Sequence, residues 1–261
     1  MDLKLDGKNA VVCGSTQGIG KAAAFELALL GADITLISRD EKKLKSVVKD
    51  LPTPIGQKHD YLVADFNFPD SLQSGLEKHF SRETFHILIN NTGGPAPGNA
   101  LDAKSDEYIK AFTNHILCNQ VLVQALVPGM KKSQYGRIIN VISTSVKIPI
   151  RGLGVSNTIR GAVANWAKTL SLELGPFGIT VNNILPGAAM TSRLETVIKS
   201  RAKKGGKSVE DIRKEMIAEI PAGRLGEASE VAAAIAFLAS PAAAYINGVS
   251  LPIDGGRTGS I

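Results

Sequence analysis

A glycine-rich turn near the start of the chain has the residue types and the spacing to bind phosphate. It follows a short apolar run, Asn9–Cys13, and leads into a helical pattern. Its first glycine permits a tight turn, its second lets backbone approach a pyrophosphate, and its third lets helix and strand pack closely. The amino end of the following helix also attracts phosphate. The pattern therefore predicts a dinucleotide site at Gly14, Ser15, Thr16, Gln17, Gly18, Ile19 and Gly20.

The end of the second expected strand indicates which dinucleotide is preferred. A site for NAD places a carboxylate there to bind the ribose 2′-hydroxyl, whereas a site for NADP uses arginine for the 2′-phosphate. The strand Ile34–Ile37 ends in Ser38 and Arg39, and a guanidinium is a planar fork that suits phosphate. Asp40 lies nearby, and we interpret it as the cap of the next helix. NADP(H) is therefore expected over NAD(H).

Further segments, taken with the glycine turn, resemble the short-chain dehydrogenase/reductase family. They are Asn90-Asn91-Thr92-Gly93, a serine at Ser143 after an apolar strand, and Pro186-Gly187 followed by Thr191. The resemblance covers nearly the whole chain. It implies a Rossmann fold and nucleotide-dependent oxidation or reduction of an alcohol or carbonyl. Within the family, the chain resembles the 3-oxoacyl-acyl-carrier-protein reductases, which implies ketones and acyl thioesters as substrates.

The reactive positions of that family carry unusual residues here. In the family, a tyrosine thirteen residues after the active-site serine donates a proton, and a lysine four residues further on lowers its pKa. With the serine matched to Ser143, these positions fall on Ser156 and Arg160. An aliphatic hydroxyl titrates far above a phenol, so Ser156 cannot be an efficient acid near neutral pH. Arg160 can still bind ribose hydroxyls, but it is a poor proton donor.

The resemblance also implies a helix asparagine that anchors a proton-relay water, and His115 occupies the matching position. Asn114 and Asn119 are close enough that a small shift in register would restore an asparagine. An imidazole with a pKa near 6.5 suits proton donation, so His115 is a candidate replacement acid. The alternative is a histidine that packs within the helix or at a subunit interface.

The remaining expected nucleotide contacts come from the resemblance. Asp65 matches an acid that accepts from the adenine amino group, and Thr191 belongs to a segment that holds the nicotinamide carboxamide. No metal site is expected. Beyond the glycine turn, the expected contacts are Ser38, Arg39, Asp65, Phe66, Asn91, Gly93, Arg160, Pro186, Gly187, Ala189 and Thr191.

Short apolar runs alternate with amphipathic segments, which predicts βαβ units and a parallel sheet. Continuously apolar strands are covered on both faces, as in a doubly wound α/β fold. We predict one Rossmann domain over residues 1–261, with about seven strands and helices on both faces. The expected strands are Asn9–Cys13, Ile34–Ile37, Tyr61–Ala64, Ile87–Asn90, Arg137–Ile142, Thr180–Ile184 and Val249–Leu251. The expected helices include Ala22–Leu30, Lys42–Asp50, Ser71–Phe80, Asn114–Met130 and Asn157–Leu174.

A basic segment over residues 192–221 follows the Pro-Gly motif, where the family places a lid over the substrate. The pair Gly205-Gly206 interrupts its helical pattern. A solvated helical hairpin is the alternative, and the two interpretations are compatible because lids belong to the less stable parts of a fold.

Composition excludes several classes of protein. There is no apolar run of about 18 residues, and the N-terminal segment lacks the apolar core of a signal peptide, so we expect a cytoplasmic protein without a membrane span. The two cysteines, Cys13 and Cys118, suggest no disulfide or metal framework. The net charge of +6 is not accompanied by clustered aromatics, which favours a phosphorylated small molecule over nucleic acid, or else a lysine-rich solvated surface.

Two functions remain open. The first is an NADP(H)-dependent oxidoreductase with a rebuilt acid, and Ser143 and the intact Pro-Gly segment favour it. The second is a nucleotide-binding pseudoenzyme, a sensor or an inactive partner in a hetero-oligomer, which Ser156 and Arg160 favour. We prefer the enzyme. A homo-oligomer, dimer or tetramer, is also expected, because two of the expected helices occupy the positions through which the family pairs its subunits. The second of these helices carries the small residues Ala162, Ala164 and Ala167.

Overall fold

The chain folds around a single parallel sheet in the computed structural model, which describes residues 1–80 and 84–260. Its strands are β1 (Asn9–Cys13), β2 (Asp33–Ser38), β3 (Asp60–Val63), β4 (Ile87–Asn90), β5 (Gly136–Val141), β6 (Ile179–Pro186) and β7 (Ser250–Ile253). Their order is β3-β2-β1-β4-β5-β6-β7. This order reverses direction between β1 and β4, and ligands of such sheets bind outside the carboxyl ends of the strands at that point.

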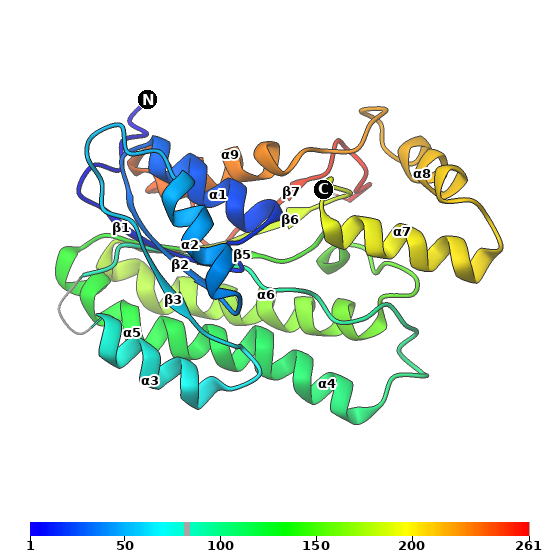
Figure 1. The fold of residues 1–261 in the computed structure, drawn as a ribbon, viewed down its shortest axis with the longest axis horizontal. Coiled ribbons are helices and arrows are strands. Elements are labelled where there is room, and N and C mark those ends of the chain that lie inside the picture. The colour runs from blue at the N-terminus through cyan, green and yellow to red at the C-terminus, as the bar shows by residue number, and fades with distance from the viewer. Residues whose placement is uncertain (81–83, 261) are drawn as a thin grey trace.

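Helices cover both faces of the sheet, which confirms the predicted doubly wound fold. They are α1 (Gly18–Leu29), α2 (Glu41–Asp50), α3 (Pro69–Phe80), α4 (Ser105–Phe112), α5 (Cys118–Ser133), α6 (Gly154–Leu174), α7 (Ser192–Gly205), α8 (Val209–Ala218) and α9 (Ala228–Ala239). α1, α2 and α9 pack against one face, and α3, α5 and α6 pack against the other (Figure 1).

The predicted strands are all present. β1 and β4 have the predicted bounds, and the ends of the others differ by one or two residues. Every residue of β4 and β5 is buried, as is typical of parallel strands that are covered on both faces.

The helices depart further from the prediction. The expected helix Asn114–Met130 is part of a longer helical run, in which α4 passes through a π-helical turn, Thr113–Leu117, into α5. α9 is an additional helix that periodicity does not reveal, because its sequence is alanine-rich and almost uniformly apolar. It is buried against α1 in the larger of the two main apolar clusters.

The basic segment over residues 192–221 forms α7 and α8, which project from one end of the molecule (Figure 1). The predicted interruption lies at Gly206, which ends α7 in the left-handed conformation with φ +60°. The two helices share a small apolar cluster of their own, which includes Ile198, Ile212 and Met216. The segment is thus a helical hairpin with its own packing. Whether it moves as a lid stays a prediction.

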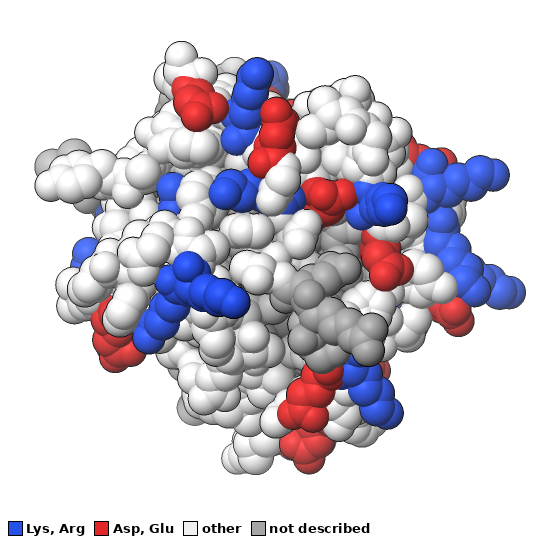
Figure 2. All heavy atoms as spheres, turned by 90° about the vertical axis from the view of Figure 1, so that its left-hand side faces the viewer, with Lys and Arg blue, Asp and Glu red and all other residues white. Residues whose placement is uncertain are grey.

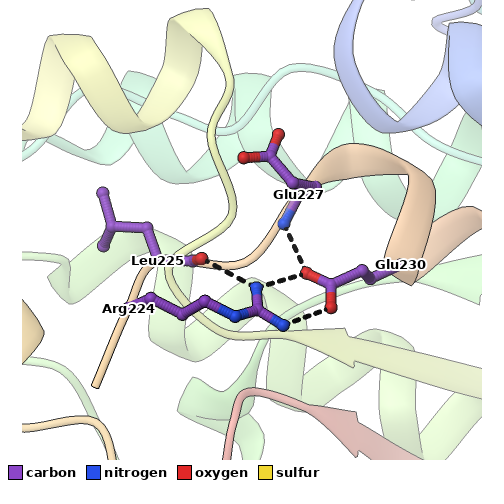
Figure 3. Close-up of polar contacts among 4 residues, drawn as sticks. All are labelled: Arg224, Leu225, Glu227 and Glu230. Carbon is purple, nitrogen blue, oxygen red and sulfur yellow. Dashed lines mark hydrogen bonds and ion pairs between the residues drawn. The ribbon is translucent and has the colours of Figure 1, made fainter. Parts of the chain in front are cut away.

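The loop between this hairpin and α9 is fixed by Arg224 (Figure 3). Its guanidinium donates to both carboxylate oxygens of Glu230, at 2.8 and 2.6 Å, and to the Leu225 carbonyl at 3.1 Å. Glu230 also accepts from the Glu227 amide at 2.8 Å, which closes the first turn of α9. The hydrogen bond from Arg224 lowers the pKa of Glu230 to about 2, so this contact is charged at all ordinary pH values.

The surface at the end away from α7 and α8 carries lysines and arginines intermixed with acids (Figure 2). The net positive charge of the chain is therefore not gathered on that face. Within the described residues, no helix is long and apolar enough to cross a membrane. The same residues contain no cluster of three or more side chains suited to a metal ion.

Candidate active site

A cavity of about 480 Å³ lies at the carboxyl ends of the central strands. One end is bordered by the glycine turn after β1 and by the end of β2, and the other by residues that follow β4, β5 and β6. The cavity thus brings the glycine turn and the end of β2 together with residues that lie much further along the chain. Every predicted nucleotide contact lines it except Ser15 and Gly20.

The glycine turn has the geometry of a phosphate cradle. Gly14 has φ +58°, and a Cβ atom there would lie 2.6 Å from the Asn91 carbonyl oxygen. A Cβ on Gly20 would lie 2.3 Å from the Gly14 carbonyl oxygen, so only glycine lets α1 approach the turn. Gln17, the residue that precedes α1, makes no capping hydrogen bond to the described chain. The first backbone amides of α1 are therefore available to an anion, and the turn fits a dinucleotide phosphate.

Ser15 and Gly20 support this cradle from behind. Ser15 is fully buried, and its hydroxyl donates to the Ile37 carbonyl at 3.4 Å. Asn91 ties the turn to the loop after β4, because its side-chain amide donates to the carbonyls of Cys13 and Gly14, each at 3.2 Å. The side-chain positions of Ser15 and Gly20 thus face the protein rather than the cavity. Contact of these two residues with the nucleotide stays a prediction.

The end of β2 presents hydroxyls and a cation to the cavity. The hydroxyls of Thr16 and Ser38 lie 3.4 Å apart, and the exposed side chain of Arg39 lines the same wall. Asp40 caps α2, as predicted, by accepting from the Lys43 amide at 3.1 Å. No ion pair of Arg39 with an acid is formed among the described residues. Its guanidinium is thus available to a phosphate.

The loop after β3 brings a carboxylate to the cavity. Asp65 accepts from the backbone and side-chain amides of Asn67, at 2.9 and 2.8 Å, which fixes its orientation. Phe66 is buried beside it, and its carbonyl accepts a hydrogen bond from the Cys118 thiol at 3.2 Å. Burial is the main reason that the pKa of this thiol rises to about 12. Cys118 is therefore a neutral core residue.

The residues after β6 close the cavity from the side of α7. Pro186, Gly187 and Ala189 line it, followed by Thr191. The Thr191 hydroxyl caps α7 by accepting from the Leu194 amide at 3.3 Å, and it lies 3.3 Å from the Ala189 carbonyl, to which it donates. Gln17 donates to the Ser192 hydroxyl at 3.1 Å, so the start of α7 is joined to the glycine turn.

The far end of the cavity brings together Ser143, Ser156 and Arg160. Ser143 accepts from the Ser145 amide at 3.1 Å, which leaves its own hydroxyl proton free to donate. Arg160 is 9% exposed and donates to the Val141 carbonyl at 2.8 Å. Burial, together with the charge of Arg193, lowers the pKa of Arg160 to about 10, so it is still a cation at neutral pH. This end therefore offers two hydroxyls and one fixed positive charge.

His115 does not belong to this group. It lies in the π-helical turn, is 3% exposed and does not line the cavity, whereas its neighbour Asn114 does. Burial, followed by the charge of Arg160, holds the pKa of His115 well below its usual range. A neutral, enclosed imidazole beside a buried cation is a poor proton donor. The structure therefore gives no support to His115 as the replacement acid, and that role stays a prediction.

A family model described as enoyl-(acyl carrier protein) reductase matches residues 14–258. The chain belongs to the short-chain dehydrogenase/reductase family.

Relatives of this short-chain dehydrogenase/reductase match along nearly their full length. An uncharacterised oxidoreductase of Mycobacterium tuberculosis is 32% identical over 257 residues, which cover 98% of this chain and 94% of the relative. The NADPH-dependent reductase BacG of Bacillus subtilis is 30% identical over 256 residues, covering 97% and 99%. The solved L-sorbose reductase of Gluconobacter frateurii, in complex with NADPH and L-sorbose, has a TM-score of 0.92 at 28% identity and covers both chains completely.

The cavity of this short-chain dehydrogenase/reductase also contains residues that the sequence does not single out. One face of α7 contributes Arg193, Val197 and Arg201, which are spaced four apart and therefore lie along one side of a helix. Lys110 of α4 and Arg257 near the carboxyl end are further basic residues of the lining. The four-residue spacing of the α7 residues is visible in the sequence, but only the fold shows which face of α7 meets the cavity.

Proposed function

We propose that this protein is an NADP(H)-dependent oxidoreductase that interconverts a carbonyl group and an alcohol, with Ser143, Ser156 and Arg160 around the reacting oxygen. One continuous cavity has the phosphate cradle at one end and these three residues at the other, which supports this reaction. When bound, the nicotinamide nucleotide supplies or accepts hydride. The relatives named above that use NADPH support the preference for NADP(H).

Each wall of the cavity has a separate part in holding the nucleotide. The glycine turn and the first amides of α1 hold the pyrophosphate. Arg39, with the hydroxyls of Ser38 and Thr16, holds the 2′-phosphate. Asp65 accepts from the adenine amino group, and the segment from Pro186 to Thr191 positions the carboxamide. We assign these roles from the residues that line each wall and from the matching positions in the short-chain dehydrogenase/reductase family.

The reacting oxygen gains negative charge during reduction, and the far end of the cavity is built to stabilise it. The fixed charge of Arg160 and the hydroxyls of Ser143 and Ser156 act as preorganised donors. One such donor is typically worth about 3–4 kcal/mol of barrier. None of the three is a good acid near neutral pH, so we propose that the proton comes from water in the open cavity. Without a general acid, the rate is expected to be about 10²–10⁴-fold below that of a tyrosine-dependent reaction.

NADPH oxidation with a panel of ketones, oxo acids and 3-oxoacyl thioesters tests this function. We expect slow turnover, with a kcat/KM that is flat through pH 6–8. It should decline as the pH rises toward about 10, because Arg160, whose pKa is lowered to about 10, then loses its charge. No inflection from His115 is expected. Arg160→Gln should lower kcat/KM by about 10²–10³-fold. Arg151→Gln, an exposed arginine outside the cavity lining, is the matched control.

Two outcomes would contradict the proposal. Tight NADPH binding without turnover of any panel member would favour the pseudoenzyme. Turnover that is unaffected by Arg160→Gln, in a variant that still binds NADPH, would place the reacting oxygen elsewhere.

We further propose that the protein is a homo-oligomer, and the exposed apolar side chains of α4 and α6 support this proposal. A cytoplasmic location stays a prediction.

A further inference from the structure

The cavity has a strong excess of positive charge. Asp65 is the only acidic side chain among the described residues that line it. The basic residues of the lining are Arg39, Lys110, Arg160, Arg193, Arg201 and Arg257. Arg39 lies at the nucleotide end, and Arg257 forms an ion pair with Glu219. The charges that are left without a partner are therefore concentrated at the end where the substrate must bind.

Arg160 and Arg193 form an arginine pair that meets at Gly94. A Cβ atom built on Gly94 would lie 3.4 Å from Nη2 of Arg193 and 3.5 Å from Nη2 of Arg160. Both guanidinium groups are thus directed to the same small patch of backbone. Both guanidinium groups donate to neutral carbonyls: Arg160 to that of Val141 at 2.8 Å, and Arg193 to that of Pro95 at 2.7 Å.

No carboxylate of the described chain forms an ion pair with either member of the arginine pair. The acid nearest to Arg193 along α7 is Glu195, and it pairs with Arg213 instead, at 3.5 Å. Arg160 is buried and Arg193 is half-buried. Neighbouring cations repel each other, and a protein normally pairs charges that it withdraws from water. The missing partner is therefore expected to arrive with a ligand.

The same face of α7 extends this positive surface. Arg201 lies two turns beyond Arg193 and also lines the cavity, and Val197 between them supplies an apolar contact. Arg201 forms no ion pair with the described residues. An arginine is a planar fork of donors that fits a carboxylate through two parallel hydrogen bonds.

We propose that the substrate of this enzyme is an oxo acid, whose carboxylate is bound by Arg193 with the support of Arg201. This proposal rests on the proposed function, because it assigns the substrate class of the same cavity. Arg160 lies between the carboxylate and the reacting oxygen and contributes charge to both. The basic face of α7 thereby selects anionic carbonyl compounds over neutral ones of the same shape.

The pyrophosphate of the nucleotide is the competing ligand for Arg193. The link between Gln17 and Ser192 brings the start of α7 to the glycine turn. The Arg193 guanidinium, however, bonds to Pro95 and approaches Arg160, which lies at the far end of the cavity. This geometry favours the substrate, and the two sources can be separated by measuring nucleotide and acid binding independently.

The test uses oxo acids and their methyl esters, which share the carbonyl and differ in charge. Acids with the oxo group at positions 2 to 5 are titrated by calorimetry into the full-length protein saturated with NADP⁺, and each is also assayed with NADPH. We expect at least one acid to bind roughly 10- to 100-fold more tightly than its ester, the range typical of hydrogen bonds to charged groups. Arg193→Gln should remove this difference, and Arg193→Lys should restore only part of it.

Lys203→Gln is the matched control, because it removes an equal charge from an exposed position of the same helix, outside the cavity. It should leave acid binding unchanged. Arg201→Gln, which should weaken acid binding less than Arg193→Gln does, serves as the second variant if Arg193→Gln does not fold.

Three results are decisive. Equal binding of all acids and esters by the native protein overturns the proposal. A loss of NADPH affinity in Arg193→Gln as large as its loss of acid affinity also overturns it, since Arg193 would then be a nucleotide ligand. Arginine-dependent binding of an acid without any turnover would support the anion site while contradicting the oxidoreductase function, so the two failures are distinguishable.

Discussion

Arg39 is the residue on which the preference for NADP(H) over NAD(H) depends most directly. Its exposed guanidinium lines the cavity next to the hydroxyls of Ser38 and Thr16, and the nearby Asp40 is used as a helix cap. The wall therefore has donors for a 2′-phosphate and no free carboxylate for a 2′-hydroxyl.

We expect Arg39→Ala to weaken NADPH binding about tenfold and to leave NADH binding nearly unchanged. The reason is that a hydrogen bond to a charged group contributes about 1.5 kcal/mol at such a solvent-exposed site. Calorimetric titration of both nucleotides measures the change. Lys42→Ala, which removes an exposed lysine of α2 that is not part of the lining, is the control. A native protein with equal affinities for the two nucleotides would contradict this account.

Spacing in the sequence predicts which residues end strands, and those residues meet at one edge of the sheet. Ser143 and Gly14 could be placed in one site for this reason. His115 could not be placed in this way, because the π-helical turn widens the helix locally and changes which side chain faces the cavity. The orientation of Arg193 depends on how α7 packs, which is a tertiary property that no local pattern encodes.

At the scale of the elements, a line of buried amides joins four neighbouring strands. Asn90 of β4 donates to Asn140 of β5 at 2.9 Å, and Asn140 donates to Asn183 of β6 at 3.0 Å. Asn183 in turn donates to the hydroxyl of Ser250 in β7 at 3.1 Å. Asn90 and Asn140 immediately precede the cavity-lining residues Asn91 and Val141, so the line of hydrogen bonds holds these strand ends in register.

Replacing Asn140 by alanine should lower the free energy of unfolding by about 3 kcal/mol, because it leaves two buried polar groups unpaired and a small void. Thr180→Val is the matched control on β6. The Thr180 hydroxyl is buried, and it has no hydrogen-bond partner within the described part of the chain. Its removal should be neutral or stabilising. Denaturant titration measures both, and equal destabilisation by the two variants would rule out a specific contribution from the amide line.

The strands of this sheet also show how far apolar runs in the sequence predict the bounds of strands. β4 has the predicted bounds, and its apolar run Ile87–Ile89 is buried as the pattern predicts. The amide line itself is not predictable, since it requires the register between strands that are far apart in sequence. α9 is missed for a related reason, because a uniformly apolar alanine-rich segment has no periodicity to read.

At the scale of the whole molecule, charge and apolar surface are distributed differently. The face drawn in Figure 2 carries mixed charges, whereas the lining of the cavity is strongly basic. Exposed apolar side chains occur on the side of the sheet covered by α4, α5 and α6 (Figure 1). Ile109 of α4 is 66% exposed, Leu117 of the π-helical turn is 42% exposed, and Leu172 of α6 is 71% exposed. Such side chains are typical of a surface that pairs with another subunit.

We therefore expect Leu172→Glu to convert the proposed oligomer into smaller species, since a carboxylate would be buried at the contact. Not all of the small residues predicted for the contact are available: Ala167 is fully buried in the protomer core, so Ala162 and Ala164 are left to permit close approach of helices. Leu29→Glu is the control, because Leu29 is 55% exposed on α1, which covers the opposite face of the sheet. Sedimentation velocity at micromolar concentration measures all three proteins. A native chain that sediments only as a 27.5 kDa species would contradict this prediction, and so would dissociation by Leu29→Glu alone, which would move the contact to the other face.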